Sequence, residues 1–293
     1  MSSAKITKDT PDTLPGVTYW VRDEEGNPTG AAIEIQWMQA YIDMGAWDAK
    51  TMVRQSCDEL FTLAARNGNT TILNPGIITP NVKDTHGGME RDFEASMEML
   101  SELEKAGTLK LRVQALPFFK NADADPEKFV AFGSRMQKKY QGDMLRCDFV
   151  KIHPDGNWNA QVSPQLEPYT TGKKGAFNIK PDRIKAVTLA ANQAGLHTII
   201  HNDGSATGRA AVDACVAAKE AGYKDMRNAI HHFTWIHPDD YKRVVEHKIP
   251  ANATPNFYND WSNQKEDAYR LLGKERTESQ LGLYTNLPND GVR

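Results

Sequence analysis

The chain has 293 residues, of which 40% are hydrophobic and 25% are charged. This is the composition of an ordinary globular protein, and the length fits one large domain or two small ones. The formal charge of −3 at pH 7 provides no basic surface for nucleic acid or for an anionic membrane. Neither is therefore expected as a partner.

The three cysteines, Cys57, Cys147 and Cys215, are far apart in the sequence and odd in number. This pattern argues against a disulfide framework and against a CxxC metal site. The N-terminus lacks the apolar core of a secretory signal, and no segment approaches about 18 uninterrupted apolar residues. The sequence predicts a soluble protein of the reducing cytoplasm.

Positions 1–30 are polar and rich in Pro, Gly and Asp, and they predict a surface arm or linker with a turn at 23–28. Helical and β-branched patterns alternate after this arm. The predicted helices cover about 49–66, 89–106, 126–140, 181–195, 206–221 and 238–247, and the predicted strands cover about 70–73, 109–116, 147–152, 197–201, 227–232 and 250–254.

This alternation of helices and short apolar strands predicts an α/β protein with a parallel sheet covered by helices. Two architectures fit it, an open doubly wound sheet and a closed (β/α)₈ barrel. The connection 153–180 is too long for a simple link. It is a candidate lid or substrate loop.

In either architecture, ligands meet the carboxyl ends of the strands. Two consecutive predicted strands end in histidine, His201 and His232. One such histidine is more often structural, but a pair at equivalent strand ends favours a metal site, because the sheet holds each imidazole rigidly. Strand alternation places His201 on the face of Ile199 and His232 on the face of Ile230, with His231 pointing the other way.

Lys151 lies at the end of another predicted strand. An ammonium group is a poor metal ligand and is costly to bury. Desolvation lowers the pKa of a lysine, and the free amine can form a Schiff base or react with CO₂ to give a carbamate that bridges two metal ions. The plainer alternative is a lysine whose side chain extends from the strand end to solvent.

Several other residues are candidates for contact with substrate. His153 shares strand parity with Lys151, and Asp155 lies in the turn that follows, as a catalytic group or as a plain turn residue. Trp158 and Tyr169 in the long loop suggest an apolar or aromatic group on the substrate, although both could pack on the rim of the fold.

Asp203, two positions after His201, is a further candidate for substrate binding. GxGxxG after a strand, GxxxxGK[ST] and GxSxG are all absent, so no nucleotide or nucleophilic-serine motif competes with the metal hypothesis. Four other histidines are expected to be structural or exposed rather than part of a site, namely His86, His197, His237 and His247.

These strand ends, in this order and spacing, resemble the YtcJ-like branch of the amidohydrolase superfamily, amidohydrolase family 3. The resemblance covers about residues 20–293. Four further segments match motifs of this family. Residues 22–30 with Glu34 resemble its RD-x-x-G-x-PTG…E segment, and Val150-Lys151 with Asp155-Gly156 resembles its VK…DG motif. Glu167-Pro168-Tyr169 resembles its EPY motif, and Arg227…Ile230-x-His232 resembles its R-x-x-I-E-H motif.

The resemblance implies a metal-dependent hydrolase with a (β/α)₈ barrel. It implies that Lys151, as an amine or a carbamate, and His201 and His232 are ligands of one or two Zn²⁺ ions. The implied reaction is hydrolysis of an amide-like C–N bond in a small molecule by a zinc-activated water. Self-association into a homo-oligomer stays open.

Three parts of the family pattern have no counterpart in this sequence, namely the first-strand His-x-His, the last-strand Asp that serves as general base, and a small β-sandwich module. His231 stands where the family has Glu, and Asn202-Asp203-Gly204-Ser205 replaces x-x-GD. We therefore expect residues 31–293 to form an incomplete barrel of about strands two to seven, with open edges. We expect such a fragment to be inactive alone.

Two other functions stay open at this point. Lys151 could be the nucleophile of a Schiff-base lyase or aldolase barrel, which borohydride would trap with a carbonyl substrate. The chain could also be a non-catalytic barrel retained as a binding or assembly module. Activity that is sensitive to a chelator would favour the hydrolase over both.

Overall fold

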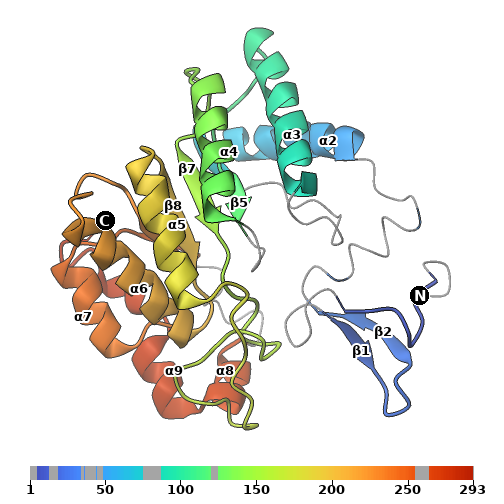
Figure 1. The fold of residues 1–293 in the computed structure, drawn as a ribbon, viewed down its shortest axis with the longest axis vertical. Coiled ribbons are helices and arrows are strands. Elements are labelled where there is room, and N and C mark those ends of the chain that lie inside the picture. The colour runs from blue at the N-terminus through green and yellow to red at the C-terminus, as the bar shows by residue number, and fades with distance from the viewer. Residues whose placement is uncertain are drawn as a thin grey trace. The chain divides into compact units, whose positions relative to one another are not determined.

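A computed structural model describes residues 5–12, 19–33, 36, 44, 49–74, 87–119, 125–254 and 264–292. The chain divides into two compact units (Figure 1). The first unit comprises residues 1–119 and 128–151, and the second comprises residues 120–127 and 152–293. Each unit is described below by itself.

The N-terminal part of the first unit is an antiparallel hairpin of β1 (Trp20–Arg22) and β2 (Pro28–Ala32). Its turn lies where Asp, Gly and Pro predicted one. The Asp23 backbone N–H donates to the Asn27 carbonyl at 2.9 Å, and the Asp23 Oδ1 accepts from the Asn27 N–H at 2.7 Å. The turn is thus confirmed, whereas the two strands were not predicted.

The described residues of the rest of the first unit form three helices and two groups of strands. In one group, β3 (Thr71–Asn74), β4 (Arg112–Ala115) and β6 (Leu145–Arg146) form a parallel sheet in that order. In the other, β5 (Phe118–Phe119) lies beside β7 (Phe149–Ile152). The helices are α2 (Ala49–Arg66), α3 (Gly87–Lys105) and α4 (Pro126–Lys139).

The core of the first unit follows from helical periodicity. Phe93, Met97 and Leu100 recur at positions i, i+4 and i+7 of α3, so they form one apolar stripe. All three are buried in a cluster that includes Val113 of β4 and Leu145 of β6. This packing fixes α3 against the parallel sheet.

The second unit continues the helix and strand alternation. Its helices are α5 (Pro181–Gln193), α6 (Ser205–Glu220) and α7 (Pro238–Glu246), and its strands are β8 (His197–His201), β9 (Ala229–His232) and β10 (Ala251–Ala253). The strands are parallel in the order β10-β9-β8. The unit ends with α8 (Gln264–Leu272), α9 (Lys274–Gln280) and the 3₁₀ turn Leu283–Asn286.

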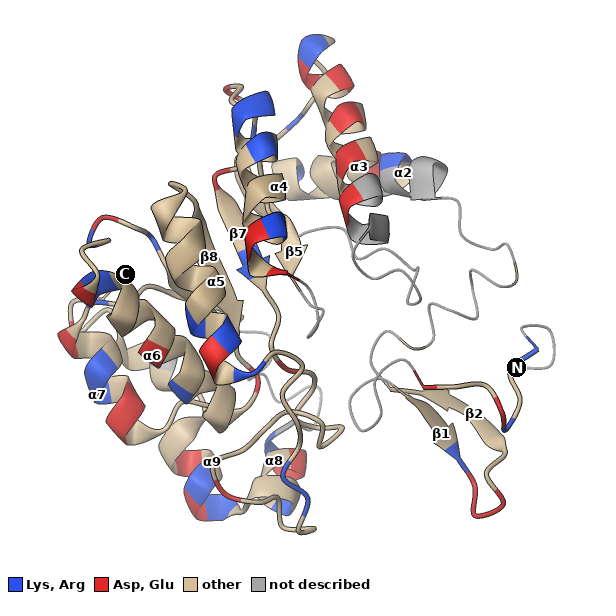
Figure 2. Ribbon diagram, viewed as in Figure 1, with Lys and Arg blue, Asp and Glu red and all other residues tan. Residues whose placement is uncertain are grey.

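Charged residues on the helices of the second unit are mixed in sign, as Figure 2 shows for α6, α7 and α9. Ion pairs between some of these residues link α6 to α7. The buried Asp240 of α7 accepts from Arg209 Nε at 2.9 Å and from Arg243 Nη1 at 3.0 Å. Arg243 also donates to Asp213 at 2.7 Å. These ion pairs fix the helices that cover the strands bearing the histidines.

Each of the six predicted strands overlaps a strand of the structure, namely β3, β4, β7, β8, β9 and β10. The prediction of an α/β fold with parallel sheets is confirmed. The cysteines are free thiols, and Cys147 and Cys215 are buried. Among the described residues, no helix combines the length and apolarity needed to cross a bilayer.

The long connection 153–180 packs closely rather than standing away from the unit. Tyr169 Oη donates to the Ser163 carbonyl at 3.0 Å, and Gln165 Nε2 donates to Tyr169 Oη at 3.1 Å. The Thr170 N–H donates to the Leu271 carbonyl of α8 at 2.9 Å. The loop is therefore held by its own buried polar groups and by α8.

Candidate metal centre

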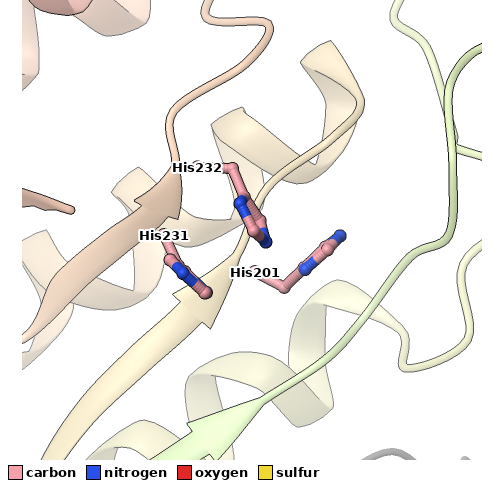
Figure 3. A group of neighbouring side chains, drawn as sticks. All are labelled: His201, His231 and His232. Carbon is pink, nitrogen blue, oxygen red and sulfur yellow. The ribbon is translucent and has the colours of Figure 1, made fainter. Parts of the chain in front are cut away.

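Three histidines gather at the carboxyl ends of β8 and β9, as Figure 3 shows. They are His201, His231 and His232, and one ligand atom from each lies within 4.8 Å of the others. The ring centroids of His201 and His232 are 4.7 Å apart, and those of His231 and His232 are 3.8 Å apart and stacked. The structure thus brings the two predicted histidines together and adds a third.

The prediction that His231 points away from His232 is wrong. Strand alternation applies only while the backbone stays extended. His232 has a φ of 66° and Phe233 a φ of 57°, so the chain turns into the left-handed region at the last residue of β9. This turn allows two consecutive side chains to share one side.

A left-handed backbone at two consecutive non-glycine residues costs on the order of 1–3 kcal/mol each, so the surroundings must enforce it. Phe233, Thr234 and Trp235 are fully buried. A Cβ atom at Gly208 of α6 would lie 2.9 Å from the Trp235 carbonyl oxygen, so only glycine lets α6 approach this segment so closely. Packing after β9 therefore maintains the turn.

The ring of His232 has a defined partner. Its Nδ1 lies 2.7 Å from Thr254 Oγ, just past β10. This hydrogen bond orients the imidazole and leaves Nε2 as the nitrogen that can reach an ion. Sequence reasoning missed Thr254, although its position after the next strand end is a signal that could have found it.

Asp155 connects His201 to the start of α6. Its side chain is 0% exposed, and its Oδ2 accepts from the backbone N–H groups of Asp203 at 3.2 Å and Gly204 at 2.8 Å. Its Oδ1 lies 3.4 Å from His201 Nε2. Asp155 therefore places a carboxylate beside the histidine and at the positive end of a helix.

Burial raises the pKa of Asp155 well above its usual range, and the charge of Asp203 raises it further. Hydrogen bonds from Thr207 and from the N–H groups of Asp203 and Gly204 oppose this rise by stabilising the ionised form. The carboxyl group thus holds a proton more tightly than an exposed aspartate does.

Two other predicted site residues lie on β7 or directly after it. The ring centroid of His153 is 4.0 Å from that of His201. Lys151 is 2% exposed, so the alternative of a side chain that extends to solvent is wrong. Lys151 belongs to the first unit and the histidines to the second. A shared site for Lys151 and the histidines stays a prediction.

The candidates Trp158, Tyr169 and Asp203 are buried in the second unit. Trp158 and Tyr169 belong to an apolar cluster with Trp235 and Leu271, and Asp203 Oδ2 accepts from the Trp158 N–H at 2.9 Å. These contacts give the two aromatic rings a packing role. Substrate binding by these three residues stays a prediction.

The remaining histidines differ in how far the structure describes them. His197 Nδ1 accepts from the Arg227 N–H at 3.1 Å, and His237 caps the start of α7, so both have the structural roles predicted for them. His247 follows the end of α7. His86 and the motif residue Glu34 lie outside the described residues.

The donor set of the histidine cluster fits a divalent transition metal. Imidazole nitrogen suits zinc, copper, iron and nickel. Two nitrogens bound to one tetrahedral zinc lie about 3.4 Å apart, because each Zn–N bond is about 2.1 Å. The three ligand atoms, which lie within 4.8 Å of one another, would have to move closer together by side-chain rotation to hold the ion. The orienting contacts from Asp155 and Thr254 complete the fit.

The loop that precedes α5 is fastened by an arginine of α9. Arg276 Nη1 donates to the Glu167 carbonyl and Nη2 to the Pro168 carbonyl, both at 2.9 Å. Charged hydrogen bonds of this kind contribute about 1.5–3 kcal/mol each. Arg276 thus holds the part of the loop that leads into the buried Tyr169.

Replacing Arg276 with alanine should let this part of the loop open more often. Trypsin should then cleave after the exposed Lys173 or Lys174 about 10-fold faster or more. The reason is that a loss of about 1.4 kcal/mol raises the equilibrium constant for loop opening tenfold. Cleavage kinetics followed by mass spectrometry would measure this. Arg270→Ala is the matched control, because the ion pair that Arg270 makes among the described residues is with Asp267, on the surface of α8. Equal rates in both variants would contradict the expected role of Arg276.

A family model described as the amidohydrolase family matches residues 1–278. The chain is 25% identical over 287 residues to the exoenzymes regulatory protein AepA of Pectobacterium carotovorum subsp. carotovorum, covering 97% of this chain and 57% of that protein. It is 23% identical over 280 residues to protein LONG AFTER FAR-RED 3 of Arabidopsis thaliana, covering 92% and 44%. The chain spans about half the length of these relatives.

Two solved structures share the fold, and both are uncharacterized metal-dependent hydrolases. The one from Pyrococcus furiosus has a TM-score of 0.60 and 22% identity, covering 88% of this chain and 48% of that one. The one from Pyrococcus horikoshii OT3 has a TM-score of 0.62 and 19% identity, covering 92% and 49%. The α/β arrangement with parallel strands is therefore common to all three chains.

Proposed function

Because the chain belongs to the amidohydrolase family, we propose that the protein hydrolyses an amide-like C–N bond of a small molecule with a bound metal ion. The observation that carries this proposal is the histidine cluster at adjacent strand ends, in which one ring nitrogen of each histidine lies within 4.8 Å of the others. Neither nucleic acid nor a membrane is part of the proposal.

We propose that His201 and His232 hold the ion, with Lys151 as a further ligand, either as the amine or as a carbamate. Zinc is the proposed metal because imidazole nitrogens suit it and because it needs no redox partner. A divalent ion bound there supplies a Lewis acid that polarises a carbonyl and lowers the pKa of a coordinated water.

The chain's own residues position the ligands. Asp155 holds the His201 ring and Thr254 holds the His232 ring. Asp155 is fully buried, its Oδ2 accepts from the N–H groups of Asp203 and Gly204, and its Oδ1 lies 3.4 Å from His201 Nε2, so we propose that it acts through His201 and is a positioning residue. His153, whose ring lies against His201, is the proposed substrate-side neighbour.

We further propose that β3, β4, β7, β8, β9 and β10 correspond to strands two to seven of a (β/α)₈ barrel. Under this proposal, the general base and the ligands of the first strand come from residues outside this chain. A Schiff-base enzyme that uses Lys151 as its nucleophile is the second candidate, and the observation that favours it is the burial of the Lys151 side chain away from solvent.

The test is turnover of a panel of N-acyl amines and cyclic amides, with metal content measured on the same sample. Both the 293-residue chain and a longer form carrying the flanking gene sequence should be assayed. In whichever form is active, removal of the metal with a chelator is expected to abolish turnover, and addition of Zn²⁺ is expected to restore it. Turnover that survives metal removal, or trapping of Lys151 by borohydride with a carbonyl substrate, would reject the hydrolase in favour of the Schiff-base enzyme.

A further inference from the structure

We infer that His231 is a third histidine ligand, so that His201, His231 and His232 together bind one divalent metal ion within the second unit. This inference rests on the proposed metal-dependent function and deepens it. The ligand set proposed above uses Lys151 from the first unit, whereas the three-histidine set needs no residue outside the β8 and β9 ends.

The first support is geometric. One ligand atom from each histidine lies within 4.8 Å of the other two. His231 and His232 are consecutive residues with rings 3.8 Å apart and an interplanar angle of 21°. In Figure 3 the His232 ring lies between those of His201 and His231, whose centroids are 6.5 Å apart.

The second support is the backbone that creates this arrangement. An extended strand would carry His231 to the opposite face without strain. The left-handed conformations of His232 and Phe233 bring His231 to the side of His232 instead. Strained backbone persists where the surrounding structure enforces it, and such sites cluster at active sites and ligand clamps.

The third support is that two of the imidazole rings are oriented by neighbouring side chains and that all three rings can be reached from solvent. Asp155 contacts His201 Nε2 and Thr254 contacts His232 Nδ1, so two of the rings have the outer partners typical of metal-bound histidines. All three histidines are partly exposed. Three protein ligands with a side open to solvent leave a fourth position for water or substrate, which is the pattern of catalytic zinc sites.

The first experiment is a calorimetric titration of the metal-free 293-residue chain with Zn²⁺. The wild-type chain is expected to bind one ion. His231→Ala and His231→Gln are each expected to weaken binding by about 100-fold, at the upper end of the 10–100-fold losses known for removal of an orienting partner. His247→Ala is the matched control, because it removes a histidine of the same unit that lies at the end of α7. Equal affinity in wild type and both His231 variants would overturn the inference.

Circular dichroism establishes whether the His231 variants fold, and a second measurement on the wild-type chain needs no variant. Zn²⁺ is expected to shift the ring ¹⁵N resonances of three histidines, His201, His231 and His232. If Zn²⁺ shifts the ring ¹⁵N resonances of His201 and His232 but not those of His231, and a chelator abolishes turnover, this inference is rejected and the proposed function stands. An absence of zinc binding together with chelator-resistant turnover would reject both.

Discussion

Substitution of Asp155 by alanine is expected to lower the free energy of unfolding by about 3–5 kcal/mol and the affinity for Zn²⁺ by about 10–100-fold. Two buried N–H groups, those of Asp203 and Gly204, would lose their acceptor. His201 would lose the carboxylate that lies 3.4 Å from its Nε2. The first loss acts on stability and the second on metal binding.

Urea denaturation and zinc titration of the same variant would measure the two effects of Asp155→Ala. Asp155→Asn should be milder, because the amide oxygen can still accept a hydrogen bond from α6. Asp182→Ala is the matched control, since Asp182 is an acid beside the start of a helix, in the first turn of α5, but is exposed. A stability loss in Asp155→Ala no larger than in Asp182→Ala would show that the buried carboxylate does not support the start of α6.

The substitution His232→Asn is expected to separate metal binding from folding. Wild type should gain about 2.7 kcal/mol of stability when Zn²⁺ is present at 100 times its dissociation constant, by simple linkage. His232→Asn should gain almost none, because it lacks the ligand nitrogen. Without metal, its stability should stay near that of wild type, because asparagine adopts the left-handed conformation of residue 232 more readily than most residues do.

Denaturation of wild type and His232→Asn, each with and without Zn²⁺, would test this separation. His247→Asn is the control, because the same substitution at the end of α7 should retain the full zinc-dependent gain. Equal zinc stabilisation of wild type and His232→Asn would remove His232 from the metal site. A metal-free variant far less stable than wild type would show instead that the imidazole itself supports the turn after β9.

The order of strands and helices could be predicted because each has a strong period and clear ends. Proline near the first helical positions of α5 and α7, and glycine with positive φ just after α5 and α6, mark helix limits that the structure reproduces. His201 and His232 could be named because parallel strands bring their carboxyl ends to one edge. Local chemistry was sufficient for these features.

The position of His231 could not be predicted, because it depends on packing far along the chain. The left-handed turn at His232 and Phe233 is held by burial of the segment that follows and by the close approach of α6 at Gly208. Alternation, the only rule available from the sequence, gives the opposite answer. Tertiary contacts overrode it.

Other elements were missed because their sequences resemble loops. The helices α8 and α9 have nine and seven residues and are mostly polar. The apolar residues of α8, Ala268, Leu271 and Leu272, lie at positions i, i+3 and i+4, but this stretch is too short to establish a helical period. The length of the connection 153–180 predicts a lid or substrate loop, with packing of its aromatic residues on the rim of the fold as the alternative. Trp158 and Tyr169 pack with Leu271 of α8, a partner that the sequence does not reveal.

The three histidines are carried by one strand–helix–strand segment, from β8 through α6 to β9. The three side chains come together when this single β8–α6–β9 crossover closes. The entropic cost of closing such a segment grows only slowly with its length. Contacts of low sequence separation also form faster than distant strand pairings do. The histidine cluster can therefore assemble early in folding, before the sheets of the chain are complete, and a metal ion present at that stage would select the conformation in which β8 and β9 are already paired.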